Sequence, residues 1–235
     1  MSNLINRAAE YYRRHGLKNS LSRARLGIKR ALFASRMVVF YCDLAKLNPA
    51  AVKVPASLRI ERLTDYADLN PHDLQQMTIF WNSKQAHRNI QERFEKGATL
   101  WLVKSGDTLA GYGWTIQGRT IEPYYFPLCI TDVHLFDFYV FPQYRGHGIN
   151  PYLVTQILEV LSSEPCARAF IEAGEWNRAQ LLSLEKTAFI RLGRVKSCSI
   201  FGYKWNTWSE NSSAQQVQIK IEQASKIQTM ANSRE

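Results

Sequence analysis

The chain has 235 residues, of which 46% are hydrophobic and 21% are charged. These proportions are those of a globular protein, and they exclude a wholly disordered chain, a collagen-like fibre and a coiled-coil rod. No apolar run approaches the roughly 18 residues of a membrane span, and the N-terminus lacks the apolar core of a secretory signal, so we expect no export. The four cysteines are scattered without CxxC or zinc spacing. We interpret them as reduced thiols of a cytoplasmic protein, and we expect no metal site.

The net charge of +10 is unevenly distributed along the chain. Residues 1–48 contain ten Lys or Arg and two acidic residues, a balance of +8. Residues 49–208 have a balance of +2, and residues 209–235 have a balance of zero. The basic character therefore belongs to the N-terminal segment.

Residues 1–48 are predicted to form a basic N-terminal extension. Apolar residues at helical spacing and capping residues at Asn3 and at Asn19 or Ser20 predict two helices before residue 36. The β-branched and aromatic run at residues 37–42 predicts a short strand within this extension.

The patterns from residue 55 to residue 208 predict one mixed α/β domain. Periodicity and turn signals place its elements in this order: a strand at 58–63, two helices within 66–96, strands at 99–104, 109–116 and 131–141, a helix at 151–162, a strand at 168–173, a helix at 178–187, and strands at 191–195 and 198–205. The polar residues 209–235 are predicted to be a flexible tail.

The segment between the 131–141 strand and the 151–162 helix has the features of an anion site. A helix N-terminus offers unpaired N–H groups and the positive end of the helix dipole. Gly146 and Gly148 allow the backbone to approach a phosphate, and Arg145 adds a positive charge. Asn150 is a candidate cap, and Pro151 suits the first helical turn. We expect a phosphate or pyrophosphate here, although neither the dinucleotide fingerprint nor the P-loop is present.

Two longer motifs resemble those of the GNAT acyltransferases. The stretch Asp137-Phe-Tyr-Val-Phe-Pro-Gln-Tyr-Arg-Gly-His-Gly-Ile149 is similar to motif A of that family. Trp176-Asn-Arg178, followed by Leu184-Glu-Lys-Thr-Ala-Phe189, is similar to motif B. The resemblance covers about residues 55–208. It implies a mixed, mostly antiparallel central sheet with flanking helices, to which the N-terminal extension is added.

The resemblance also implies acetyl-CoA or another acyl-CoA as co-substrate. The CoA pyrophosphate would lie on the amides from Arg145 to Asn150, and the pantetheine arm would pair with the strand edge at Phe138–Val140. A backbone N–H near Val140 would polarise the thioester carbonyl. The implied cofactor-binding residues are Phe138, Tyr139, Val140, Gln143, Arg145, Gly146, His147, Gly148, Ile149, Asn150 and Asn177.

The implied reaction requires a base, because an amine with a pKa near 10 is about one part in a thousand neutral at pH 7. Asp137 and Glu172 interrupt strands that are otherwise apolar, so these two carboxylates are the predicted catalytic residues. His134 and Glu175 are weaker candidates.

One position departs from the family pattern. Leu184 stands where many members have a tyrosine that protonates the departing thiolate, and Ala188 replaces a glycine. Ser183 and Tyr203 are alternative donors. A thiol with a pKa near 8.5 can also leave unaided.

The sequence therefore predicts an enzyme, an N-acyltransferase that moves an acyl group from coenzyme A to a primary amine. Two alternatives stay open: a long-chain N-acyltransferase that uses acyl carrier protein, and a catalytically silent acyl-CoA-binding module.

Aromatic residues within 66–96 and 118–130 are expected to shape the acceptor entrance. The basic extension suggests an anionic membrane surface or an acyl carrier protein as partner, with attachment to the inner face of the membrane as an option. Nucleic acid is not expected, because no binding motif for it is present.

Overall fold

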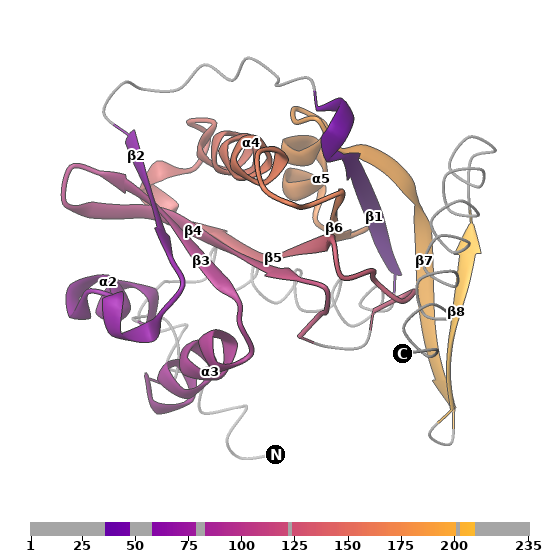
Figure 1. Ribbon diagram of the computed structural model, residues 1–235, viewed down its shortest axis with the longest axis horizontal. Helices are drawn as coiled ribbons and strands as arrows, with labels where there is room; N and C mark the ends of the chain where they lie inside the picture. The colour runs from indigo at the N-terminus through magenta and orange to yellow at the C-terminus, as the bar shows by residue number, and fades with distance from the viewer. Residues whose placement is uncertain (1–35, 48–57, 79–82, 122–123, 201–202, 210–235) are drawn as a thin grey trace, which may run out of the picture.

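The computed structural model describes residues 36–47, 58–78, 83–121, 124–200 and 203–209 (Figure 1). Within these ranges one eight-stranded sheet has the order β2-β3-β4-β5-β6-β1-β7-β8. The strands are β1 (Arg36–Asp43), β2 (Leu58–Leu63), β3 (Thr99–Ser105), β4 (Thr108–Gln117), β5 (Asp132–Val140), β6 (Arg168–Gly174), β7 (Ile190–Ile200) and β8 (Tyr203–Ser209). The α-helices are α2 (Pro71–Thr78), α3 (Ser83–Glu95), α4 (Ile149–Ser162) and α5 (Arg178–Leu184).

The sheet is mixed and mostly antiparallel, as predicted. Every neighbouring pair is antiparallel except β5 and β6, which run parallel. The parallel pairing extends only from Asp132–Arg168 to Leu135–Ile171. The chain between these two strands contains α4, which is the crossover that a parallel pair requires.

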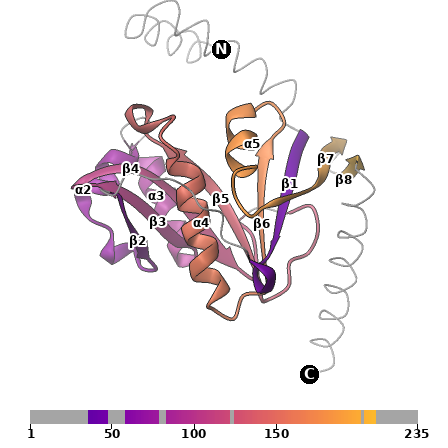
Figure 2. The same cartoon turned by 90° about the horizontal axis from the view of Figure 1, so that it is seen from above.

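Helices cover the two faces of the sheet separately. Helices α4 and α5 lie on one face and α2 and α3 on the other (Figure 1). Seen from above, α4 lies over the β3–β5 part of the sheet (Figure 2). Leu153, Ile157 and Leu158 of α4 pack into one core together with inward side chains of the sheet. A second core forms beneath β3 and β4, where Trp114 contacts Phe94 of α3.

Strand β1 is an interior strand of the sheet. The strand predicted at residues 37–42 is present, but it pairs with β6 on one side and with β7 on the other. Val38, Val39 and Phe40 are completely buried, because both faces of β1 are covered. This segment is therefore continuous with the domain from which the sequence analysis separated it. The two helices predicted before residue 36 lie outside the described residues.

The last two strands differ from the prediction. Two strands were expected at 191–195 and 198–205, whereas β7 runs unbroken through Lys196 and Ser197. Its first half pairs with β1, and its second half pairs with β8 from Arg194 to Ile200. These hydrogen bonds keep the polar dipeptide extended. Most of the predicted tail lies outside the described part of the chain.

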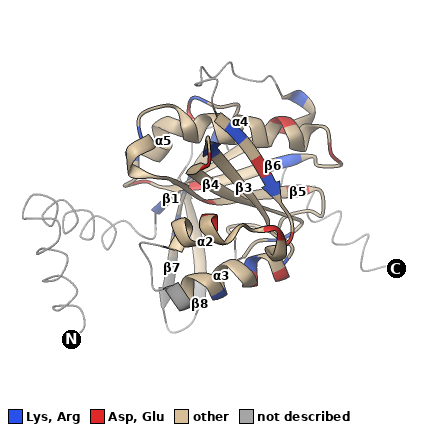
Figure 3. Ribbon diagram, turned by 90° about the vertical axis from the view of Figure 1, so that its left-hand side faces the viewer, with Lys and Arg blue, Asp and Glu red and all other residues tan. Residues whose placement is uncertain are grey.

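In the described part of the chain, Cys42, Cys129 and Cys166 form no disulfide bond. Among the residues that the structure describes, no helix is both long and apolar enough to cross a membrane. Basic and acidic residues are mixed along α3 and over the β2–β3 side (Figure 3).

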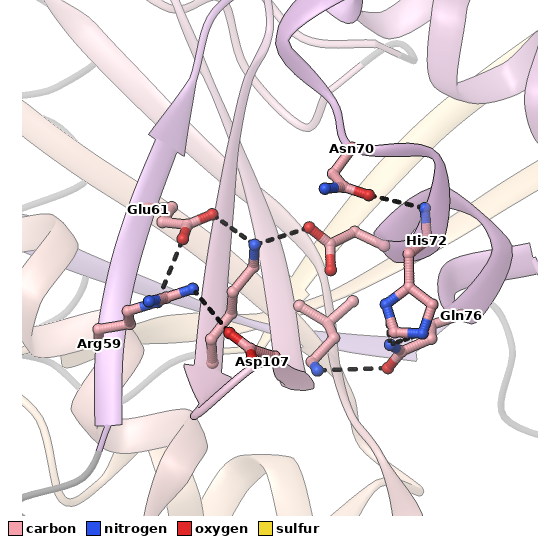
Figure 4. Close-up of polar contacts among 9 residues, drawn as sticks. Arg59, Glu61, Asn70, His72, Gln76 and Asp107 are labelled. Atoms are coloured by element: carbon pink, nitrogen blue, oxygen red, sulfur yellow. Dashed lines mark hydrogen bonds and ion pairs between the residues drawn. The ribbon is translucent and has the colours of Figure 1, made fainter.

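A buried ion cluster joins α2 to the sheet (Figure 4). The Lys104 Nζ of β3 lies 2.7 Å from a carboxylate oxygen of Glu61 and 2.7 Å from one of Asp73. Asp73 is 2% exposed and Lys104 is 7% exposed. Burial by itself lowers the pKa of Lys104, but the hydrogen bonds to Asp73 and Glu61 outweigh it, so the pKa is raised. The protonated Lys104 therefore contributes stability that is present at neutral pH and is lost as the pH rises through this raised pKa.

Replacing Lys104 should destabilise the fold, because the carboxylates of the cluster lose their cation. We expect Lys104→Met to lower the free energy of unfolding by about 3 kcal/mol, because Asp73 then stays buried without a cation. Urea denaturation at pH 7 measures the change. The matched control is Arg59→Met at the outer end of the same cluster, where the side chain is 56% exposed; it should cost less than about 1 kcal/mol. Equal effects of the two variants would contradict the argument.

Candidate active site

The strands β5 and β6 separate after Leu135 and Ile171, and this opening is the centre of the site. Beyond that pair, β5 continues to Val140 and bonds only to β4. The Phe141 N–H donates to the Ala110 carbonyl of β4. Successive N–H groups of an extended chain point to opposite edges. The Val140 N–H is therefore directed into the opening.

A buried ion pair fastens the opposite end of the two strands. Asp132 of β5 is completely buried, and its carboxylate accepts from Arg168 Nε at 2.6 Å and Nη2 at 2.7 Å. It also accepts from the Cys129 N–H at 2.7 Å. Burial alone lowers the pKa of Arg168, and the bonds to Asp132 raise it, with a raised pKa as the net result. The strands are thus fixed where they meet and free where they diverge.

Strand β5 has a bulge beside the opening. Its register with β4 shifts between Trp114–Phe136 and Tyr112–Tyr139. Asp137 occupies this bulge with φ 51°, the only positive φ of a non-glycine residue in the described part of the chain. An extra residue of this kind bends a strand and turns a side chain toward the other face. Asp137 consequently reaches α3, where its Oδ2 accepts from Arg93 Nη1 at 2.6 Å.

This contact binds Asp137, the first of the two predicted catalytic carboxylates, to Arg93 of α3. The Arg93 guanidinium also lies over the rings of Trp114, at 5.2 Å, and Phe136, at 5.5 Å. It therefore fixes the bulge to α3. No sequence signal distinguished Arg93 from other helix-surface arginines.

On the α4 face, Phe138 covers Gly113 of β4. A Cβ at Gly113 would stand 2.5 Å from the Phe138 ring, so only glycine fits there. Gly111 has a similar role, since its Cβ would meet the Tyr139 carbonyl at 2.8 Å. The two glycines let the β5 segment that borders the opening lie flat against β4.

The loop before α4 contains the residues for which the sequence predicts an anion site, and we call residues 145–150 the cradle. Gly146 has φ 85°, and Gly148 has φ 74° and is the N-cap of α4. The N–H groups of the five residues from Gly146 to Asn150 have no hydrogen-bond acceptor among the described residues. Gln143, Arg145 and His147 are exposed around them. Unpaired N–H groups at the positive end of a 14-residue helix form a site for a phosphate.

The cap of α4 differs from prediction. The helix begins at Ile149, so Asn150 lies inside the helix, and the cap is Gly148. The Asn150 Nδ2 instead donates to Ser183 Oγ of α5 at 2.8 Å, which ties the two helices together. The Arg145 Nε donates to the Val140 carbonyl at 3.0 Å. Arg145 thereby connects the cradle to the end of the β5 edge.

The second predicted carboxylate, Glu172, lies at the opening itself. It is one residue beyond the last β5–β6 pair, and its side chain is 20% exposed. Its Oε2 is 2.9 Å from His134 Nε2 of β5. The Tyr124 hydroxyl is buried, and its pKa is raised well above the ordinary value by burial and then by the charge of Glu172. Of the two predicted bases, only Glu172 is held at the point where the strands part.

Motif B has a structural role in this fold. Asn177 caps α5, since its Oδ1 accepts from the Gln180 N–H at 3.3 Å and its Nδ2 donates to Gln180 Oε1 at 3.0 Å. Leu184 is completely buried in the core beneath α4. Leu184 has a hydrocarbon side chain, so it cannot serve as an acid. The side chain of Tyr203 lies outside the described residues.

The loop between β4 and β5 supplies the aromatic residues on the side opposite α4. Phe126 is buried against Phe170 and contacts Trp208, so it belongs to a core cluster. Tyr124 lies between this cluster and the site, with its ring 4.8 Å from that of His134. A cavity of about 400 Å³ lies in the same loop, lined by Arg119, Thr120, Tyr124, Tyr125, Phe126, Pro127 and Leu128. The expected acceptor-side residues Phe80 and Trp81 lie outside the described residues.

Comparison with known proteins decides the family. The profile of the acetyltransferase (GNAT) family matches residues 66–189, more than half of the chain. The chain belongs to the GNAT acetyltransferase family. Its members are transferases, and the matched region contains both motifs, the cradle and Glu172. In the described part of this GNAT protein, no group of three or more His, Cys, Asp or Glu side chains could hold a metal ion.

Individual relatives of this GNAT protein are distant. Mouse thialysine N-epsilon-acetyltransferase is 36% identical over 47 residues, which are 20% of this chain and 28% of the mouse enzyme. A tandem GNAT protein from the clavulanic acid biosynthesis pathway has a TM-score of 0.50 at 15% identity, over 76% of this chain and 55% of that chain. A GNAT-family acetyltransferase from Colwellia psychrerythraea has a TM-score of 0.47 at 14% identity, over 67% and 53%. The chain thus spans about a quarter to a little over half of these relatives.

Removing the buried carboxylate that fastens β5 to β6 should destabilise the domain. We expect Asp132→Ala to lower the free energy of unfolding by about 3–5 kcal/mol, because the Arg168 guanidinium, 14% exposed, loses its counter-ion. Thermal and urea unfolding measure this change.

The control for this variant is Glu175→Ala. Glu175 is 30% exposed and lies 3.9 Å from Arg36 and 3.6 Å from Arg194. Exposed pairs of this kind contribute about 1 kcal/mol or less. A loss at Asp132 no larger than that at Glu175 would show that the buried pair does not fasten the strands.

Proposed function

We propose that this GNAT protein transfers an acyl group from coenzyme A to a primary amine by direct attack on the thioester. The observation that carries the proposal is the set of five unpaired N–H groups at Gly146–Asn150, placed beside an open strand edge. A pyrophosphate fits the first feature, and an extended amide-containing chain fits the second. Coenzyme A has both groups in one molecule.

The cradle residues would hold the donor in two places. The pyrophosphate would accept from the backbone between Gly146 and Asn150, with the exposed Gln143, Arg145 and His147 around it. The pantetheine amides would pair with the free edge of Phe138–Val140. Asn177 would contribute by keeping the start of α5 in place, since both polar atoms of its side chain bond to Gln180.

The reacting carbonyl would lie between β5 and β6. The Val140 N–H, directed into the opening, would donate to the oxygen that becomes negative in the tetrahedral intermediate. Glu172 would accept a proton from the incoming ammonium group, directly or through water. Asp137 would act by shaping the β5 bulge and by its charge, because Arg93 occupies one of its oxygens.

The departing thiolate needs no protein acid in this scheme. Leu184 leaves the α5 position apolar and buried. A thiolate whose conjugate acid has a pKa near 8.5 is a competent leaving group and can take its proton from solvent.

Thermal unfolding with coenzyme A and with acetyl-, butyryl- and palmitoyl-CoA tests donor binding. A ligand at 100 times its dissociation constant adds about 2.7 kcal/mol of stability, and the acyl chain that raises the Tm most identifies the donor class. We expect Gly146→Ala to remove most of this shift, because alanine strains the φ of 85° that presents the amides.

Gly97→Ala is the matched control for this variant. Gly97 has φ 77°, and at both glycines a Cβ would meet nothing within 4 Å. The two variants should lose similar stability without ligand, but Gly97→Ala should keep the full shift with coenzyme A. No shift of the wild-type chain with any of the four compounds would remove the donor site and refute the proposal.

The specific observation that favours a second function is Leu184. A catalytically silent acyl-CoA-binding module would show the same thermal shift and release no CoA from acetyl-CoA with any amine. Thialysine is one suitable amine for that assay, because the mouse relative is named for it. Turnover with any primary amine excludes the silent module, and preferential turnover of palmitoyl-CoA or acyl carrier protein would support long-chain transfer.

The basic N-terminal segment suggests where the enzyme works. Its balance of +8 over residues 1–48 would attract it to an anionic membrane surface, at about 1 kcal/mol for each Lys or Arg near the lipid. We expect deletion of residues 1–35 to abolish co-sedimentation with phosphatidylserine vesicles and to leave the CoA thermal shift unchanged. If the full-length chain ignores such vesicles at low salt, membrane attachment is wrong.

A further inference from the structure

A buried imidazole holds the carboxylate that the proposed reaction uses. The Nε2 of His134 lies 2.9 Å from Glu172 Oε2, across the point where β5 and β6 begin to diverge. An ionised carboxylate can only accept hydrogen bonds, so this ring nitrogen carries the proton. With Glu172 as the carboxylate that the proposed reaction needs, His134 Nε2 is the donor and Glu172 Oε2 is the acceptor.

His134 is itself fixed in place from both sides. Its side chain is 6% exposed. Its ring stacks on Phe136, with centroids 5.4 Å apart, and lies 4.8 Å from the ring of Tyr124. The Nδ1 atom is buried and has no partner among the described residues. An imidazole with one buried, unpaired nitrogen and one nitrogen on a carboxylate is not explained by core packing alone, because an unpaired buried polar atom costs stability.

Two other side chains border Glu172. Val39 of β1 is its register partner and is completely buried. The Tyr124 hydroxyl faces the carboxylate from the β4–β5 loop, and its raised pKa keeps it protonated well into alkaline solution. The Glu172 side chain is 20% exposed, and Glu172 lies one residue past the last β5–β6 pair.

We propose that His134 is a positioning residue that aims the Glu172 carboxylate at the amine in the opening between β5 and β6. This proposal rests on the proposed function, since it assigns the residue that makes Glu172 an oriented base. His134 and Glu172 lie on the face opposite α4, so the amine approaches from the side away from the cradle. The donor and the acceptor then meet at the opening from opposite faces of the sheet.

The step balances as follows. An ammonium N–H bond breaks, and the proton moves to the Glu172 oxygen that is not bonded to His134. The nitrogen lone pair forms the C–N bond at the thioester carbonyl, and the C=O π pair moves to the carbonyl oxygen. This pair re-forms the C=O bond on collapse. When the intermediate collapses, the C–S bond breaks with its electron pair on sulfur. The second amine proton and the proton on Glu172 pass to the thiolate and to solvent.

Three variants distinguish a role of His134 in positioning Glu172 from a role in core packing. His134→Phe keeps an aromatic ring between Phe136 and Tyr124 but has no donor for Glu172. We expect it to lower kcat about tenfold or more, a part of the 10²–10⁴-fold that general-base catalysis contributes, with the KM for acetyl-CoA unchanged. His134→Gln should recover part of kcat, because its amide N–H can donate to Glu172. Tyr41→Phe is the control, since it removes a hydroxyl from a ring that contacts Phe170 of β6, with centroids 5.6 Å apart, and should change nothing.

The assay measures CoA release from acetyl-CoA with thialysine, lysine, spermidine or glucosamine as the amine. Equal losses in His134→Phe and His134→Gln, or a loss that appears only in KM, would overturn the proposal. If the wild-type chain releases no CoA with any of these amines while binding acetyl-CoA, the proposed function fails separately.

A proton NMR measurement tests the pairing without any substrate. The wild-type chain should show a downfield, slowly exchanging imidazole N–H resonance that is absent from both His134→Phe and Glu172→Leu. Its persistence in Glu172→Leu, or its absence from the wild-type chain, would show that His134 does not hold Glu172.

Discussion

The site depends on the short parallel pairing of β5 and β6. Only the residues from Asp132 to Leu135 pair with β6, and the Asp132–Arg168 ion pair fixes the closed end of this ladder. A parallel pair that continued further would hydrogen-bond every backbone group along β5. Because it stops, the last residues of β5 keep a free edge in the interior of the sheet. The two strands are therefore held together at one end, and this fixes where the opening at the other end lies.

The features around the opening follow from how β5 meets its other neighbours. The bulge at Asp137 turns one side chain toward α3, where Arg93 binds it, and leaves Phe138 on the α4 face against Gly113. The strand then ends in a tight loop whose glycines start α4 with its N–H groups unpaired. A strand edge and a helix N-terminus thus border one another. Glu172 and His134 lie on the opposite face of the same opening.

Much of this arrangement was predictable from the residues. The order of elements, the anion loop, motif A and the position of Glu172 beside the opening follow from local patterns of glycine, proline and interrupted apolar runs. Asn150 as a cap was wrong, because a glycine with positive φ ends the loop two residues earlier than the predicted capping side chain would. The unbroken β7 was also missed, because strand pairing on both sides overrode its polar dipeptide.

The sequence by itself determined the anion loop and the two motifs, since these depend on contacts between residues close in the chain. Only the tertiary structure decided that β1 is an interior strand, that Arg93 binds Asp137 and that Leu184 is buried in the core. It also decided that His134 is the partner of Glu172. Each of these contacts joins segments tens of residues apart, and no local pattern specifies which distant segment will be the neighbour. Their geometry is fixed only when all the strands of the sheet have paired.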